Sequence, residues 1–440
     1  MAEVVVIGAG FGGLSAAHTL VRDGHSVTVF EARDRVGGRV HTVTDFIDGR
    51  RIEAGGELIG TNHHSWLRLA RELGLGLSLI TDDDDFEAMG LAPPLFLRGR
   101  SITGKTARRL WASVERTEHL LSALADAAIP DPEAPWSAPA AAALDAQDVG
   151  AWLTAHVSDP LARAWLEKSF YGEYGVSPDQ QSLLGLLAGL AGQPDAWSTY
   201  EAFRCADGNQ ALARGLAARL GDRIHRSSPI DRITLDATGV TVHTAAAVQV
   251  RADAAVLAVP PSVWDRITVT PALPPGYRTQ MGVVLKYLSH LDRRLWISSG
   301  AAPTGSDDVI GSLWESTDQQ QGPDRIGLAV FAGGPTAEAA LAAADTDAHY
   351  AGHLERIFPG YRAGLQGTRF VPWSREPWTR GGYTTPAPGE VTGALRRLNE
   401  EPWQERLFFA GEHTDARFYG FMEGALRSGA RVAAKISDIF

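Results

Sequence analysis

A glycine-rich segment near the N-terminus has the residue types and spacing to bind a phosphorylated ligand. Gly8, Gly10 and Gly13 form the pattern GxGxxG between an apolar, β-branched run at residues 4–7 and a helical stretch at 14–22. The first glycine of such a turn permits the tight bend, the second lets the backbone approach a pyrophosphate, and the third lets the helix pack on the strand. The start of the helix adds N–H groups and a partial positive charge. The pattern therefore predicts a dinucleotide-binding turn.

A carboxylate lies where such a turn needs one for a ribose. Residues 26–30 predict a second strand, and Glu31 follows it, 23 positions after Gly8. A carboxylate at this strand end accepts hydrogen bonds from ribose hydroxyls. The strand at residues 26–30 completes a βαβ unit. We expect Ala32 and Arg33, which follow Glu31, to line the same site.

Two further segments favour a flavin over a nicotinamide dinucleotide. Residues 33–39 carry three arginines and a glycine pair, ending in Gly38 and Arg39. Guanidinium groups bind phosphate oxygens through paired hydrogen bonds. Gly55 and Gly56 form a second glycine pair, suited to backbone that lies against a flat ring. These segments together predict a flavin dinucleotide.

These motifs resemble the FAD-binding signature of flavin-dependent amine oxidases, the group of monoamine and polyamine oxidases. Further segments resemble that family in its order along nearly the whole chain: residues 134–139, 256–261, 380–385, 409–414 and 420–425. The resemblance implies bound FAD, a small-molecule amine as substrate and O2 as the electron acceptor. The amine would be oxidised to an imine by hydride transfer to flavin N5, and the imine hydrolysed to an aldehyde or ketone.

Lys286 is the most informative single residue. It interrupts the apolar run 282–285 of a predicted strand, and the chain has only four lysines. Burying an ammonium group there without a purpose would be costly. The resemblance implies that Lys286 holds a water against flavin N5 and assists reoxidation by O2. The alternative is a lysine at a strand edge whose ammonium reaches solvent.

Three aromatic residues match positions near the flavin in this family. The resemblance implies that Tyr383 and Phe421 flank the substrate amine, where two ring faces orient it by contacts related to cation–π attraction. The family usually has tyrosine at the second position, so Phe421 keeps the ring face and loses a hydroxyl. Trp373 matches an aromatic packed near the flavin. Core packing is the alternative for these rings.

The resemblance implies several more cofactor contacts. Glu412, next to Gly411, would hydrogen-bond the ribityl–phosphate region, and Ile230 would meet the adenine through its backbone. The last helix, opening near Met422, would direct its N-terminus at the flavin pyrimidine carbonyl and stabilise negative charge on the reduced ring. Gly382 stands where mitochondrial relatives carry the cysteine that bonds the flavin, so we expect non-covalent FAD.

Two glutamates fall near the substrate cavity of the family. Glu57 follows the second glycine pair and is also expected to contact the cofactor, and Glu201 lies further along the chain. Either carboxylate could pair with a second cationic group on the substrate. A solvated or locally hydrogen-bonded glutamate is the alternative.

Motifs at both ends of the chain predict an α/β fold of two domains. A Rossmann-like FAD-binding domain would be discontinuous, and a mixed sheet plus helices would form the substrate domain. Strands are also expected at residues 278–288 and 326–332. The expected boundaries are 1–75, 205–265 and 385–440 for the FAD-binding domain, and 76–204 and 266–384 for the substrate domain, with a helical subdomain at about 101–200.

Composition narrows the class of protein. The 440 residues are 44% hydrophobic and 21% charged with a net charge of −11, so we expect a globular protein without a cationic field for nucleic acid. No export signal and no apolar run of about 18 residues is evident, and Cys205 is the single cysteine. We therefore expect a cytoplasmic protein that does not bind membranes. The oligomeric state stays open, with a homodimer as one option.

Some alternatives stay open at this point. An L-amino-acid oxidase would need an arginine for the substrate carboxylate, and the 37 arginines do not exclude one. A carbon–carbon desaturase of the protoporphyrinogen or carotenoid oxidase type shares the FAD fold, but Lys286 and the aromatic pair argue against it. Residues 99–106 match the P-loop pattern GxxxxGK[ST], but the surrounding sequence favours a hairpin that turns at residues 98–99. No metal-binding motif is present.

Overall fold

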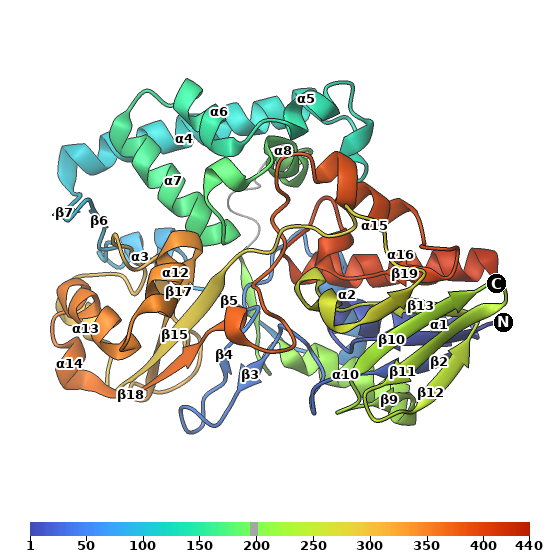
Figure 1. The fold of residues 1–440 in the computed structure, drawn as a ribbon. Helices are drawn as coiled ribbons and strands as arrows, with labels where there is room; N and C mark the ends of the chain where they lie inside the picture. The colour runs from blue at the N-terminus through green and yellow to red at the C-terminus, as the bar shows by residue number, and fades with distance from the viewer. Residues whose placement is uncertain (194–200) are drawn as a thin grey trace.

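A parallel sheet joins the two ends of the chain in the computed structural model, which describes residues 1–193 and 201–440. Its strand order is β19 (Leu407–Phe409), β13 (Ala254–Leu257), β1 (Glu3–Ile7), β2 (Ser26–Phe30) and β9 (Ile224–His225). Every neighbouring pair is parallel. The two termini lie side by side at one side of the molecule (Figure 1), where the Met1 amine donates a hydrogen bond to the Phe440 carbonyl.

Helices cover one face of this sheet, and a second sheet covers the other. The helices are α1 (Phe11–Arg22), α10 (Gln210–Leu220) and α16 (Met422–Ile439). The second sheet has the order β12 (Gln249–Ala252), β11 (Gly239–Thr244), β10 (Ile230–Asp236) and β14 (Thr268–Thr270). Because both faces are covered, the strands of the parallel sheet are apolar almost throughout. The predicted α/β class with a Rossmann-like βαβ unit is confirmed.

A separate four-stranded sheet carries Lys286. Its order is β16 (Ser312–Glu315), β17 (Ile326–Gly333), β15 (Val284–Leu291) and β18 (Leu365–Val371), and all neighbours are antiparallel. The prediction of a strand from residue 278 was wrong at its start, since β15 begins at Val284. The preceding backbone pairs with a loop instead: the Gly282 N–H donates to the Tyr383 carbonyl at 2.7 Å.

Helices dominate the chain between residues 104 and 190, as the sequence pattern predicts. They are α4 (Gly104–Ala128), α5 (Ala141–Asp145), α6 (Val149–His156), α7 (Pro160–Tyr174) and α8 (Leu183–Leu190), and they share a hydrophobic core of their own. Figure 1 shows them as a layer above the two sheet regions. None of the described helices is long and apolar enough to cross a bilayer. The domain boundaries stay a prediction.

Short elements connect these parts. Gly99 lies in the turn between β6 (Phe96–Leu97) and β7 (Arg100–Ser101), so the P-loop-like segment is a hairpin followed by α4. The remaining α-helices and strands of the described residues are β3 (Thr42–Val43), β4 (Ile52–Glu53), α2 (His64–Leu73), β5 (Leu77–Leu79), α3 (Asp83–Ala88), β8 (Phe203–Cys205), α11 (Leu295–Ser298), α12 (Gly334–Ala342), α13 (Thr346–Ile357), α14 (Tyr361–Gly364) and α15 (Arg396–Glu400).

A methyl group added at Gly429 should push α16 away from α1. A Cβ at this position would lie 2.3 Å from the Gly12 carbonyl oxygen and 2.7 Å from the Ala16 nitrogen. We expect Gly429→Ala to lower the free energy of unfolding by about 1–3 kcal/mol, the usual cost of overpacking, and to lower the Tm followed by circular dichroism. Gly393→Ala is the matched control, because nothing lies within 4 Å of the added Cβ there. An equal Tm for both variants would contradict the close contact.

Candidate active site

A cavity of about 990 Å³ lies between the parallel sheet and the sheet that carries Lys286. Almost all the site residues that were predicted from the sequence line this cavity. They are Gly8, Gly10, Glu31, Ala32, Arg33, Gly38, Arg39, Gly55, Gly56, Glu57, Glu201, Ile230, Lys286, Trp373, Tyr383, Gly411, Glu412, Phe421 and Met422. Gly13 does not line the cavity: a Cβ there would lie 1.9 Å from the Gly8 carbonyl oxygen. Its lack of a side chain lets α1 pack on the turn, the role predicted for the third glycine.

The glycine turn and Glu31 are held together by backbone hydrogen bonds. Gly8 has a φ of +105°, a conformation that favours glycine, and α1 begins three residues later. The Glu31 carboxylate accepts hydrogen bonds from the N–H groups of Ala9 at 2.7 Å and Arg33 at 2.8 Å. This fixes a buried carboxylate at the end of β2, beside the turn, as the βαβ pattern predicts.

The second glycine pair lets two loops cross. A Cβ at Gly55 would lie 1.9 Å from the Arg39 carbonyl oxygen, and a Cβ at Gly56 would lie 3.4 Å from the Met422 sulfur. The close approach that Gly55 permits is therefore to neighbouring backbone. Gly56 lies against the Met422 side chain at the start of α16, and both residues line the cavity.

An ion pair connects the N-terminal and C-terminal parts of the site. Arg39 Nη1 lies 2.6 Å from Glu412 Oε1 and donates to the Gly382 carbonyl at 2.8 Å. Glu412 is buried and also accepts from the Gly420 N–H at 2.7 Å. The ion pair of Arg39 and Glu412 thus connects the loop that ends in Arg39, the loop of Gly382, and the segment before α16.

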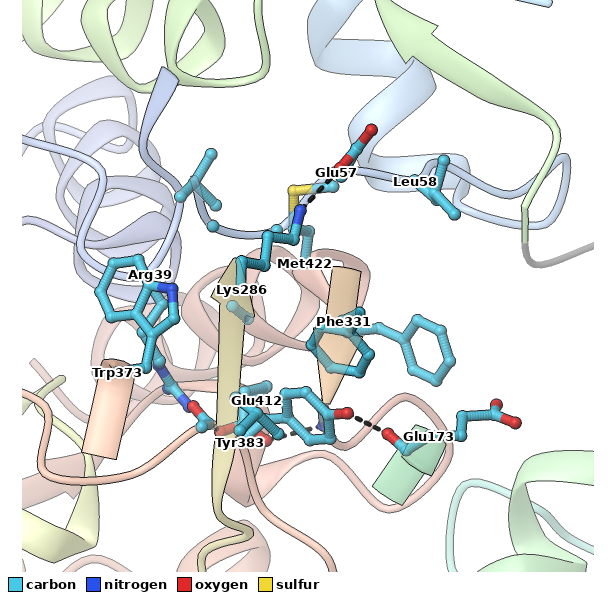
Figure 2. A pocket seen from close by; sticks show the side chains of 18 of the residues that line it. Arg39, Glu57, Leu58, Glu173, Lys286, Phe331, Trp373, Tyr383, Glu412 and Met422 are labelled. Carbon is cyan, nitrogen blue, oxygen red and sulfur yellow. Dashed lines mark hydrogen bonds and ion pairs between the residues drawn. The ribbon is translucent and has the colours of Figure 1, made fainter. Parts of the chain in front are cut away.

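Lys286 lies at the centre of its sheet, opposite Phe331 on β17 and Val371 on β18. Its side chain is 4% exposed, so the alternative of an edge lysine that reaches solvent is wrong. The ammonium donates to Glu57 Oε2 at 2.6 Å (Figure 2). It also donates to the Glu53 carbonyl at 3.0 Å and lies 5.3 Å from the Trp314 ring centroid.

Glu57 is shared by three donors. Besides Lys286, Arg204 donates to its carboxylate through Nε at 2.8 Å and Trp314 through Nε1 at 2.9 Å. Burial alone would raise the pKa of Glu57, but Lys286, Arg204 and Trp314 lower it below its ordinary value. Glu57 is therefore a charged partner of Lys286.

Aromatic side chains surround the space beside Lys286. Tyr383 and Phe421 both line the cavity, and Figure 2 shows Phe331 in the same wall. The Tyr383 hydroxyl donates to the Glu173 carbonyl, and Trp373 Nε1 donates to the Ala54 carbonyl at 2.8 Å. Polar groups at the ring edges are thus bonded, and the arrangement can orient a small organic group.

Two carboxylates face the cavity beyond the aromatic residues. Desolvation, followed by the charges of Glu201 and Glu118, raises the pKa of Glu173 to about 8. Burial followed by the charge of Glu57 also raises the pKa of Glu201. Both residues are exposed by their accessible surface, and both line the cavity.

Sequence reasoning missed several residues of the site. Glu173 ends α7, Arg204 lies on β8, Trp314 on β16 and Phe331 on β17. Only Glu173 carried a local signal, as a charge beside the apolar residues of a helix end. The others join the site through sheet pairing far along the chain, which no local pattern indicates.

Comparisons with known proteins agree with this geometry. Residues 11–437 match the family of flavin containing amine oxidoreductases. The chain is 29% identical over 474 residues to putrescine oxidase from Kocuria rosea, covering 99% of this chain and 95% of the relative. It is 26% identical over 453 residues to L-amino acid dehydrogenase from Synechocystis, covering 99% and 94%. Its fold resembles cyclohexylamine oxidase from Brevibacterium oxydans with a TM-score of 0.86 at 25% identity, covering 100% and 99%.

The chain therefore belongs to the flavin containing amine oxidoreductase family. The family predicted from the motifs is confirmed, and with it the prediction of a flavin-dependent amine oxidase.

Replacing Glu173 with glutamine should stabilise the ligand-free protein at alkaline pH. The raised pKa means that the folded state keeps a proton that the unfolded state releases, so this carboxyl lowers stability as the pH rises from its ordinary pKa of 4.5 towards about 8. Glutamine has no such titration. The gain in Tm of Glu173→Gln over the parent should therefore be larger at about pH 9 than at about pH 6.

Glu167→Gln is the control, because Glu167 lies on the same helix with a side chain 44% exposed. Its Tm shift should be the same at both pH values. A pH-independent shift for Glu173→Gln would contradict the raised pKa.

Proposed function

We propose that this protein is an FAD-dependent oxidase of amines. Bound FAD would supply the redox chemistry, accepting a hydride at N5 from the carbon next to the amine nitrogen and passing the electrons to O2 to give hydrogen peroxide. The observation that carries the proposal is a buried lysine beside a cavity with a glycine turn at one end and aromatic rings at the other. Water would then hydrolyse the released imine to an aldehyde or ketone.

The residues of the cavity fit FAD. Glu31 is held at the end of β2, where it would accept bonds from the adenosine ribose, and Ile230 would meet the adenine through its backbone. The start of α1 would bind the pyrophosphate through free N–H groups. Glu412 would contact the ribityl–phosphate region, and the start of α16 at Met422 would stabilise negative charge on the flavin ring.

The chain's own side chains would orient the substrate and keep water out. Tyr383 and Phe421 would hold the neutral amine between their rings, while Phe331 and Trp373 add apolar wall. Lys286 would hold a water beside the flavin through its remaining N–H. Because a hydride would leave the carbon of a deprotonated amine with both bonding electrons, no side chain is needed to remove a proton from that carbon.

We also propose that the substrate carries a second cationic group. Glu57 is already bound by three donors, but Glu201 and Glu173 face the cavity and form no ion pair with another described residue. Their raised pKa values mean that a nearby ammonium group would favour their charged forms. A diamine meets this requirement.

A panel of substrates tests the function. The purified yellow protein is mixed with monoamines, diamines and L-amino acids while peroxide and flavin absorbance are followed together. Diamines should bleach the flavin and yield peroxide most efficiently. Turnover of L-amino acids alone would instead favour the amino-acid oxidase alternative, which the pairing of Arg39 and Arg204 with carboxylates disfavours.

Lys286→Met should slow reoxidation more than reduction. Methionine keeps the apolar stem and removes the ammonium beside the flavin site. We expect the rate of reoxidation by O2 to fall by at least about tenfold, a loss of roughly 1.4 kcal/mol of transition-state stabilisation, while anaerobic reduction by amine changes less. Stopped-flow measurement of the two half-reactions checks this, and equal slowing of both would remove the role proposed for Lys286.

The flavin should be released intact when the protein is denatured in acid. Gly382 has no side chain to bond it, and a Cβ there would lie 2.4 Å from Val284 Cγ2, so the site has no room for a cysteine. All the yellow colour should pass into the supernatant after acid precipitation. Colour that stays with the precipitated chain would contradict non-covalent binding.

A further inference from the structure

We propose that Glu57 is a positioning residue that controls, through Lys286, how readily the bound flavin is reoxidised by O2. The inference rests on the proposed function, because it concerns the second half of that reaction. It assigns Glu57 a part in the choice of electron acceptor, which separates an oxidase from a dehydrogenase.

The geometry fixes the Lys286 ammonium from one side. Two of its three N–H groups are donated to Glu57 Oε2 and the Glu53 carbonyl, at 2.6 and 3.0 Å. Glu57 follows the second glycine pair in a loop that lines the cavity, and Glu53 ends β4 directly before that loop. Figure 2 shows the lysine side chain reaching along the cavity wall to Glu57. One N–H is left for the water that the proposed function requires.

The same contact reduces the charge that Lys286 presents. A carboxylate 2.6 Å away opposes the field of the ammonium at every point further off, and little water is present between them to screen either charge, since both side chains are under 5% exposed. Removing only the negative charge would therefore strengthen the positive field at the flavin edge.

The charge of Glu57 is itself divided. Arg204 Nε lies 2.8 Å from Glu57 Oε1, so Arg204 also pairs with this carboxylate. On its other side, Arg204 Nη1 lies 3.5 Å from Asp318 Oδ2. The four charges of Lys286, Glu57, Arg204 and Asp318 sum to zero. The net electrostatic field of these charges at the flavin thus depends on how strongly the Glu57 carboxylate pairs with Arg204 and how strongly it pairs with Lys286.

This balance acts on reoxidation because electrons moving to O2 build negative charge beside Lys286. In the complete step, two electrons from the reduced flavin and two protons convert O2 to hydrogen peroxide, and Lys286 is not consumed. A cation aimed at developing negative charge lowers the barrier. It also stabilises the reduced flavin and raises its midpoint potential. Glu57 therefore restrains both quantities.

The test compares Glu57→Gln with the parent protein, each loaded with FAD. Glutamine can still accept the hydrogen bond from Lys286 but carries no charge. The flavin is reduced with dithionite, so that no amine is involved, and then mixed with O2. We expect reoxidation to be several-fold faster. The equilibrium with a redox dye should shift about tenfold toward reduced flavin, which is about 30 mV for a two-electron couple.

Two further variants make the result specific. In a Lys286→Met background the Glu57→Gln change should have less than half its effect on the reoxidation rate, because no ammonium is then left for Glu57 to hold in place. Arg204→Gln should act in the opposite direction, lowering the potential and slowing reoxidation, because it leaves the whole carboxylate to Lys286. It also provides the test if Glu57→Gln does not bind FAD.

The proposal is overturned if the potential and the reoxidation rate of Glu57→Gln match the parent, or if the reoxidation rate changes equally without Lys286. It is equally overturned if Arg204→Gln moves both quantities upward. Since dithionite replaces the substrate, these outcomes do not depend on whether amines reduce the flavin, and a failure of the proposed function would be seen separately.

Discussion

The buried ammonium of Lys286 is the constraint on which the site depends. An unpaired charge in a protein interior costs several kcal/mol, and Lys286 lies in the middle of a sheet with 3% of its surface exposed. The fold meets this cost by bringing Glu57 to within 2.6 Å, from a position 229 residues earlier in the chain. That contact joins the loop after β4 to the sheet that contains β15. The pair therefore places two opposite charges in the cavity wall and connects these two parts of the fold.

Close approach of backbone segments completes the enclosure. At Gly55 and Gly13 a side chain would collide with a carbonyl oxygen at 1.9 Å, so these positions let a loop and a helix pack against their neighbours. The pair of Arg39 and Glu412 then joins the N-terminal loops to the segment before α16. A dinucleotide needs such a surface of backbone and fixed charges at one end, while a reacting amine needs the dry aromatic space at the other.

Local patterns in the sequence predict much of this arrangement. The glycine turn and Glu31 are specified within one βαβ unit, and the burial of Lys286 could be inferred from the apolar residues before it. The pairing of Glu57 with Lys286, Arg204 and Trp314 could not be predicted, because the partners lie on separate strands and the choice between them depends on tertiary packing. The start of β15 was misplaced for the same reason: residues before Val284 pair with the Tyr383 loop, and apolar periodicity does not report such a pairing.

The central claim is that an amine loses a hydrogen from carbon to a flavin held in this cavity. The most direct measurement is anaerobic mixing of the FAD-loaded protein with a diamine and with the same diamine deuterated at the carbons next to nitrogen. The account predicts that both bleach the yellow absorbance and that the deuterated compound does so more slowly. If neither amine bleaches a flavin that dithionite reduces readily, the account is contradicted.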